Sequence, residues 1–142
     1  MKREEIICVS LSIFIFLLIS AILFFVPFSY DSSKIENNTV INVIDGDTFE
    51  YIDTTSNEIV KVRLLCVDTP EKGETGYEEA KEYLSSLILG QKVILKSSVN
   101  DKDDYGRALR YVYFNDLLIN KIIITNGYGD LWIIPPETCD EM

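Results

Sequence analysis

Residues 60–71 (VKVRLLCVDTPE) have the pattern of a β-strand that ends abruptly in a turn. Apolar side chains occupy every second position of one face of residues 60–67, and Arg63 lies on the opposite face. Pro70 cannot donate to a strand ladder, and it disfavours the helical region for Thr69. The strand is therefore expected to end at this point.

Carboxylate, hydroxyl and guanidinium groups meet where this strand ends. Asp68, Thr69 and Glu71 follow the strand directly, and Arg63 lies behind them on it. A phosphodiester is anionic, and its pentacovalent transition state carries further negative charge that guanidinium groups and a divalent cation stabilise. We interpret the segment as half of a site for metal-assisted phosphodiester hydrolysis.

Two further motifs, each weak alone, complete the set. DGDT at residues 45–48 and DYGR at residues 104–107 are, taken singly, most often turns. DYGR nevertheless contributes a second guanidinium, Arg107, in addition to that of Arg63. Two arginines supply the paired donors that match the oxygens of a phosphodiester in its transition state.

Carboxylates in these motifs supply the hard oxygen ligands that calcium takes. Asp47 and Asp68, with the backbone carbonyl of Thr69, are the candidate ligands. The chain contains no histidine, which excludes histidine-based acid–base catalysis and histidine-ligated zinc. A carboxylate must then position or deprotonate the attacking water, and Glu71 is the candidate.

The motifs DGDT, RLLCVDTPE and DYGR, in this order, resemble those of the staphylococcal-type thermonuclease family. The resemblance covers about residues 40–129 and implies an OB-fold barrel. It also implies hydrolysis of DNA and RNA at the 5′ P–O bond, which leaves 3′-phosphates. The implied roles are calcium binding by Asp47, Asp68 and the Thr69 carbonyl, catalysis by Arg63, Glu71 and Arg107, and a phosphate contact from Tyr105.

Hydrophobic periodicity predicts three strands, one helix and two more strands. The expected elements are strands at residues 39–44, 48–53 and 59–67, a helix between Gly76 and Gly90, and strands at residues 92–98 and 108–114. This order suits a five-stranded Greek-key barrel of the OB type, α+β and mainly β, with one or two packed helices. Periodicity alone does not choose it over other small α+β folds.

Residues 117–126 fit either a strand or a buried helix by local pattern. The resemblance implies a helix at about residues 119–126, in which Asn120 matches a buried structural asparagine rather than a catalytic group.

Residues 6–26 are uncharged and long enough to cross the hydrocarbon core of a bilayer as a helix. Lys2 and Arg3 precede them, so we expect a cytoplasmic N-terminus and an external domain. A cleaved signal peptide, giving a secreted domain, is the alternative. The predicted organisation is an anchor at 1–28, a linker at 29–38, a nuclease-like domain at 39–132 and an irregular tail at 133–142; we expect a monomer.

Charge is the main argument against a nucleic-acid substrate. Lys and Arg total 13 against 23 Asp and Glu, a formal net charge of −10, whereas non-specific nucleic-acid binders are usually basic. The runner-up interpretation is a catalytically weak or inactive OB-fold binding module with an acidic surface. A third is an acidic anchor domain whose carboxylates only bind calcium.

The sequence departs from the family pattern in three places. The loop after Glu71 is short and has few lysines, and Asp104 stands where secreted relatives have a lysine, which is expected to weaken substrate binding. Relatives also continue beyond Trp132 into a third helix, whose lack is expected to lower stability or expose apolar surface. Trp132 itself is interpreted as a base-stacking platform or as a residue buried in the core or at a membrane surface.

The three cysteines, Cys8, Cys66 and Cys139, show no spacing typical of a metal cluster or a disulfide framework. Cys66 is therefore interpreted as a small core residue of its strand.

Overall fold

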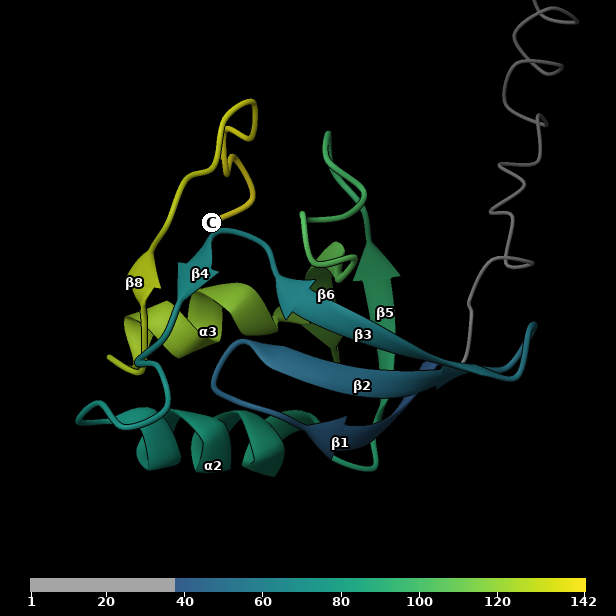
Figure 1. Cartoon of the computed structure of the whole chain (residues 1–142), viewed down its shortest axis with the longest axis horizontal. Coiled ribbons are helices and arrows are strands. Elements are labelled where there is room, and N and C mark those ends of the chain that lie inside the picture. Colours follow the sequence, from purple (N-terminus) through teal and green to yellow (C-terminus); the bar gives the residue numbers. More distant parts are fainter. Residues whose placement is uncertain (1–37) are drawn as a thin grey trace, which may run out of the picture. The chain divides into compact units, whose positions relative to one another are not determined.

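Five strands close into a β-barrel in the computed structural model, which describes residues 38–142 (Figure 1). Strands β1, β2 and β3 form an antiparallel meander, β5 pairs with β1, and β6 pairs with β5. A parallel pairing of β3 with β6 closes the barrel. The predicted OB-type architecture is thereby confirmed. The strands are β1 (Asn38–Val43), β2 (Thr48–Asp53), β3 (Glu58–Leu64), β5 (Lys92–Lys96) and β6 (Ala108–Phe114).

Three short strands extend this framework. β7 (Leu117–Leu118) pairs with the end of β6. β4 (Val67–Asp68) and β8 (Asp130–Leu131) form a separate two-stranded sheet, seen beside α3 in Figure 1. This small sheet joins the end of the strand that carries Arg63 to the C-terminal part of the chain.

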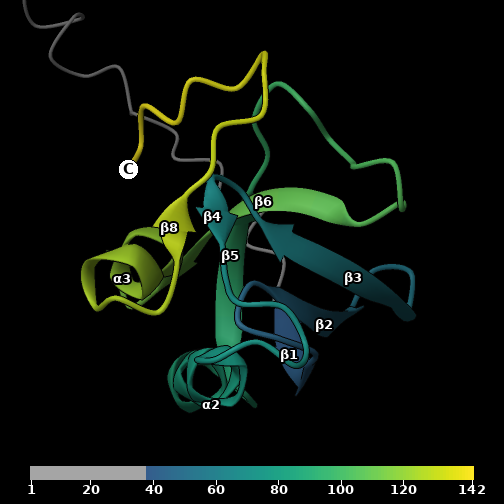
Figure 2. The ribbon, with the colours of Figure 1, turned by 60° about the vertical axis from the view of Figure 1, so that its left-hand side comes forward.

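Two helices cover the barrel, α2 (Tyr77–Ile88) against β1 and α3 (Ile119–Thr125) against β6 (Figure 2). The apolar stripe predicted for the first helix is present, since Ala80, Leu84 and Ile88 are buried at successive i, i+4 positions. Gly90 follows it with a φ of +74°, the left-handed conformation of a C′ glycine. The barrel core contains Val40, Phe49, Val62, Leu64, Leu84, Ile88, Val93, Val112, Ile119 and Ile123.

Helix α3 confirms what the family resemblance implies for residues 119–126, against the β-propensity of its isoleucines. Ile119 and Ile123 are buried on one helical face. Asn120 is fully buried, and its side chain accepts the N–H of Val112 and donates to the carbonyls of Leu65 and Arg110. Asn120 is a structural residue, because its amide joins α3 to two segments of the barrel wall.

The continuous strand predicted for residues 59–67 is wrong. β3 ends at Leu64, and a turn at residues 65–66 precedes β4. Cys66 has a φ of +63°, which is uncommon outside glycine. Leu65 and Cys66 are buried in a second apolar cluster with Leu109, Tyr111 and Cys139. Both faces of this stretch are covered, so its alternation carries no information about where the strand ends.

Cys66 is buried as expected, but it forms a disulfide with Cys139, with Cα atoms 6.0 Å apart and a sequence separation of 73. The interpretation without a disulfide is therefore wrong. The pairing depends on the tail returning past β4 and β8, which spacing in the sequence does not show. Cys8 lies outside the described residues.

The anchor predicted at residues 6–26 also lies outside the described residues. Between residues 38 and 142, the helices are too short or too polar to cross a membrane.

Candidate active site

The DGDT motif is the hairpin between β1 and β2, and it fixes Asp47 at the start of β2. Asp45 Oδ1 accepts the backbone N–H of Asp47 at 3.1 Å, and the Asp47 carbonyl accepts the N–H of Leu64 at 2.8 Å. Gly46 allows a close approach, because a Cβ there would lie 2.7 Å from the Cβ of Ala80 and 2.8 Å from Oγ1 of Thr69. The hairpin thus packs directly on α2 and on the strand end.

Arg63 bridges the two predicted acidic ligands. Its Nη1 lies 2.7 Å from both carboxylate oxygens of Asp47, and its Nη2 lies 3.2 Å from Oδ1 of Asp68 and 3.2 Å from the Val67 carbonyl oxygen. The Asp47 side chain is only 4% exposed, whereas that of Asp68 is 48% exposed. One guanidinium therefore holds a buried and an accessible carboxylate together.

Burial raises the pKa of Asp47 to about 6 from its ordinary value of 3.8, and Asp45 raises it further, against the lowering effect of the Arg63 charge. The hydroxyl of Thr48, which donates to Asp47 Oδ1 at 2.8 Å, also favours the ionised form. Asp47 is thus a desolvated carboxylate whose ionised form benefits from further positive charge.

The metal-ligand candidates form a small oxygen-only set. Thr69 is buried next to Asp68, so its carbonyl belongs to the same strand end. Among residues 38–142, no group of three or more acidic or cysteine side chains is arranged to hold a metal ion. Two carboxylates and a carbonyl suit a hard cation such as calcium, which completes its coordination shell with water.

Arg107 is held by a turn that Asp103 organises. The Asp103 carboxylate accepts Nε–H of Arg107 at 2.6 Å, its backbone N–H at 2.9 Å and the N–H of Tyr105 at 3.0 Å. Although burial opposes the shift, the hydrogen bonds from Arg107 hold the pKa of Asp103 below its ordinary value. Nη1 of Arg107 reaches Oγ1 of Thr48 at 3.4 Å, which links this turn to the DGDT hairpin.

Sequence reasoning missed Asp103. The available signal was an aspartate four residues before an arginine, with a glycine between them, which favours a closed turn.

A hollow of about 240 Å³ brings the predicted catalytic residues together: it is lined by Arg63, Glu71, Asp103, Asp104, Tyr105, Arg107, Leu109 and Ile134. Glu71 is exposed, and within residues 38–142 its carboxylate has no hydrogen-bond or ion-pair partner. Tyr105 is 86% exposed, with its ring centroid 5.4 Å from the guanidinium carbon of Arg107. The hollow therefore offers two guanidiniums, an accessible carboxylate and an exposed phenol.

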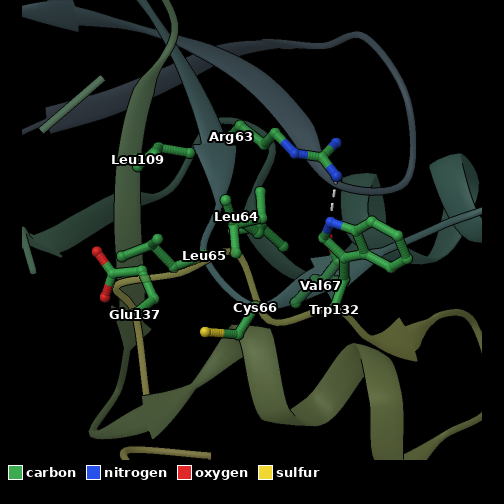
Figure 3. Close-up of a pocket in the computed structure, with 9 residues that line it drawn as sticks. Arg63, Leu64, Leu65, Cys66, Val67, Leu109, Trp132 and Glu137 are labelled. Atoms are coloured by element: carbon green, nitrogen blue, oxygen red, sulfur yellow. Dashed lines mark hydrogen bonds between the residues drawn. The ribbon is translucent and has the colours of Figure 1, made fainter. Parts of the chain in front are cut away.

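Trp132 lies beside Arg63 at a narrow space of about 10 Å³ (Figure 3). Figure 3 shows the Arg63 guanidinium and the Trp132 indole on one side of this space and Glu137 on the other. Trp132 is 54% exposed, so its interpretation as a core residue is wrong. The neighbouring Leu131, Ile133 and Ile134 are also exposed, as expected for apolar surface near the end of the domain.

Residues 61–140 match the family model described as staphylococcal nuclease homologue. The chain belongs to the staphylococcal nuclease homologue family. An uncharacterized endonuclease of Haemophilus influenzae is 34% identical over 111 residues, which cover 78% of this chain and 61% of that protein. The thermonuclease of Staphylococcus intermedius is 34% identical over 119 residues, covering 78% of this chain and 70% of that protein.

A third relative, endonuclease YncB of Bacillus subtilis, is 30% identical over 120 residues, covering 79% of this chain and 56% of that protein. Against this protein and the one from H. influenzae, the chain spans less than two thirds of the relative's length. The match to the staphylococcal nuclease homologue family includes the segments that carry Arg63, Asp68, Glu71 and Arg107. Asp47 precedes the matched range, and the structure joins it to that range through Arg63.

Proposed function

We propose that this chain is a calcium-dependent nuclease that hydrolyses phosphodiester bonds of DNA, RNA or both and leaves 3′-phosphates. The observation that carries the proposal is one hollow lined by Arg63, Glu71 and Arg107 in a member of a nuclease family. Names of relatives that read endonuclease and thermonuclease support it.

Each side chain has a role that its environment suits. Arg63 and Arg107 bind the non-bridging oxygens of the scissile phosphate, where guanidinium donors match developing charge. Glu71, which is accessible and whose carboxylate has no partner within the described part of the chain, takes a proton from the attacking water. The water oxygen forms the new bond to phosphorus and the bond between phosphorus and the 5′ oxygen breaks. The 5′ oxygen leaves as a hydroxyl with a proton from solvent, and the phosphate stays on the 3′ oxygen.

Asp47, Asp68 and the Thr69 carbonyl would hold the calcium ion, which supplies positive charge at the phosphate oxygens when it is bound. The desolvated carboxylate of Asp47 supports this role, because a nearby cation favours its ionised form.

We further propose that residues 6–26 anchor the protein in a membrane as a single span, with the N-terminus cytoplasmic and the nuclease domain outside as a monomer; cleavage within this region would make the domain secreted. The Cys66–Cys139 disulfide supports an external domain, since disulfides persist in oxidising compartments. Protease digestion of intact cells tests the placement: an external domain should be degraded without lysis, and protection would contradict it.

A cleavage assay with the full chain in detergent tests the activity. Single-stranded DNA and RNA are incubated with millimolar calcium or with a chelator, and the products are treated with a 3′-phosphatase. We expect calcium-dependent cleavage and a mobility change after phosphatase treatment. Glu71→Ala should abolish most activity, whereas Glu79→Ala, an exposed carboxylate on α2, should not. Absence of cleavage by the wild type at any calcium concentration would contradict the proposal.

The acidic charge favours a second candidate, a weakly active or inactive OB-fold binding module. The net charge is −10, and Asp103 and Asp104 border the hollow itself. If that candidate holds, the wild type shows little or no calcium-dependent cleavage of single-stranded DNA at millimolar calcium, with or without chelator.

A further inference from the structure

The C-terminal segment, residues 132–142, is bound to both parts of the chain that carry the catalytic arginines. One part is the Arg63 segment, residues 63–68, which includes Cys66 and Asp68. The other is the Arg107 segment, residues 100–107, which includes Asp103. In Figure 2 the C-terminal segment continues from β8 toward the loop between β5 and β6, which contains the Arg107 segment.

Two bonds join the C-terminal segment to the Arg63 segment. The disulfide links Cys139 to Cys66, and the N–H of Trp132 donates to the Cys66 carbonyl at 3.2 Å. Cys66 adopts a left-handed conformation, and the next two residues present the Val67 carbonyl and the Asp68 carboxylate to Arg63. The disulfide therefore fastens the turn that sets the position of the Arg63 guanidinium.

Glu137 joins the C-terminal segment to the Arg107 segment. Its Oε1 accepts the N–H of Asn100 at 2.8 Å, at the start of that segment. The Glu137 residue is only 5% exposed, and its Oε2 has no hydrogen-bond partner within the described part of the chain. Burying a carboxylate with one oxygen that accepts no hydrogen bond costs folding free energy. This cost offsets the stabilisation from the single hydrogen bond with Asn100, so stability alone does not explain a glutamate at this position.

Ile134 lies in the sequence between Trp132, which binds the Arg63 segment, and Glu137, which binds the Arg107 segment. It lines the hollow with Arg63 and Arg107, and it also lines the narrow space that Arg63 and Glu137 share. The N–H of Glu137 donates to the Ile134 carbonyl at 2.9 Å. The hydrogen bond from Asn100 to Glu137 therefore also holds Ile134 in place at the edge of the hollow.

We propose that the C-terminal segment sets the spacing of the two arginines, with Cys139 acting as a positioning residue for Arg63 and Glu137 as one for Arg107. The inference rests on the proposed nuclease function. Both guanidiniums must align on one phosphate in the transition state, and small misplacements cost far more in turnover than in substrate binding. Loosening either attachment should therefore lower kcat and leave KM nearly unchanged.

The first test removes the disulfide in two ways. Cys139→Ser removes the disulfide by substitution. In the wild type, dithiothreitol removes it: the reagent gives two electrons and two protons, the disulfide becomes two thiols, and the reagent becomes a cyclic disulfide. We expect kcat to fall on the order of ten- to hundredfold, with KM changed less than about threefold. Reoxidation of the reduced wild type should restore kcat, and dithiothreitol should not affect Cys139→Ser further.

The second test uses two substitutions of Glu137 and a matched control. Glu137→Leu removes the acceptor for the Asn100 N–H, while Glu137→Gln keeps it. We expect kcat to fall about tenfold in the first variant and to remain near the wild-type value in the second. Glu141→Leu is the control, because this carboxylate of the same segment binds Lys96 and Tyr113, on β5 and β6, and contacts neither arginine segment.

Hydrogen exchange measures the positioning without relying on activity. In Cys139→Ser, the amide of Leu65, which donates to the Arg110 carbonyl, should exchange faster. In Glu137→Leu, the amide of Leu109, which donates to the Asp101 carbonyl, should exchange faster. The amide of Leu84 in α2 should exchange at the wild-type rate in both variants. If the oxidised wild type cleaves no substrate, the nuclease proposal fails, but faster exchange in both regions still supports the positioning role. Unchanged exchange and unchanged kcat in folded variants would overturn it.

Circular dichroism at the assay temperature decides between a local and a global role. If Cys139→Ser and Glu137→Leu both lose the signal of the folded barrel, the C-terminal segment stabilises the whole domain and the local positioning role is refuted.

Discussion

The carboxylate of Asp103 binds Arg107 at two points, the guanidinium Nε at 2.6 Å and the backbone N–H at 2.9 Å. The same carboxylate accepts the N–H of Tyr105, so one side chain fixes the turn, the arginine and the exposed phenol. The second arginine of the candidate site therefore depends on a residue that lies outside the DYGR motif itself.

Substitution Asp103→Asn should lower kcat. The amide keeps one acceptor oxygen but loses the charge that holds the guanidinium, so Arg107 is less well oriented. We expect kcat to fall about tenfold, with a melting temperature lowered by a few degrees. Asp104→Asn is the matched control, since within residues 38–142 that carboxylate has no hydrogen-bond or ion-pair partner. An equal kcat of Asp103→Asn and Asp104→Asn would contradict the role given to Asp103.

Asp104→Lys should strengthen substrate binding. Asp104 borders the hollow and places negative charge where an anionic substrate must approach. A lysine there would add a phosphate contact, which is expected to lower KM several-fold at low salt. The slope of log KM against log salt concentration should increase by about one, because one more counterion is released on binding. Steady-state kinetics on single-stranded DNA at several salt concentrations measure this change. A KM that is unaltered at low salt would show that the substrate does not pass Asp104.

The bounds of β2 and β6 were predictable because turn residues flank both strands, and both strands begin and end at the predicted residues. In β2 the buried Phe49 and Tyr51 also alternate with the less buried Glu50 and Ile52. The end of β3 was misplaced because Leu65, Cys66 and Val67 are all buried, so burial does not alternate there and no glycine or proline marks the turn at residues 65–66. Where both faces of a strand are covered, its end can be read only from the turn residues that flank it.

The candidate site was predictable in its chemistry but not in its support. Arg63, Glu71 and Arg107 could be selected because their side chains match a phosphodiester, and the structure lines one hollow with all three. Cys139 and Glu137 act at Cys66 and Asn100, far away in the sequence, through a tail without regular structure. Such contacts form only when the chain folds back, so no local pattern indicates them.

Tyr113 should make the stability of the domain fall at high pH. The hydrogen bond from its hydroxyl to Glu141 raises the pKa of Tyr113 to about 12, and burial adds to the shift. Because the pKa is raised on folding, the protonated Tyr113 hydroxyl stabilises the folded domain fully at pH values below 10.0, its pKa in the unfolded chain. This stabilisation is lost as the pH rises through about 12. Chemical denaturation at several pH values measures it. Tyr113→Phe should show a shallower fall in unfolding free energy between these values, and equal slopes would contradict the assignment.

Gly46→Ala should destabilise the barrel by steric conflict. A Cβ at this position would lie 2.7 Å from the Cβ of Ala80 and 2.9 Å from the Cβ of Thr69, so the hairpin must move away from α2. We expect a loss of about 1–3 kcal/mol of unfolding free energy, measured by urea denaturation. Ala80→Gly removes one of the two conflicting carbons. The double variant should therefore lose less unfolding free energy than the sum of the losses in the two single variants. Strict additivity would show that Gly46 is not placed there by its contact with α2. Because the hairpin also carries Asp47, Gly46→Ala should weaken the calcium-induced rise in melting temperature as well. Gly73→Ala is the control, because it strains a residue with a φ of +98° but places no atom within 4 Å of its Cβ, and it should leave the calcium-induced rise unchanged.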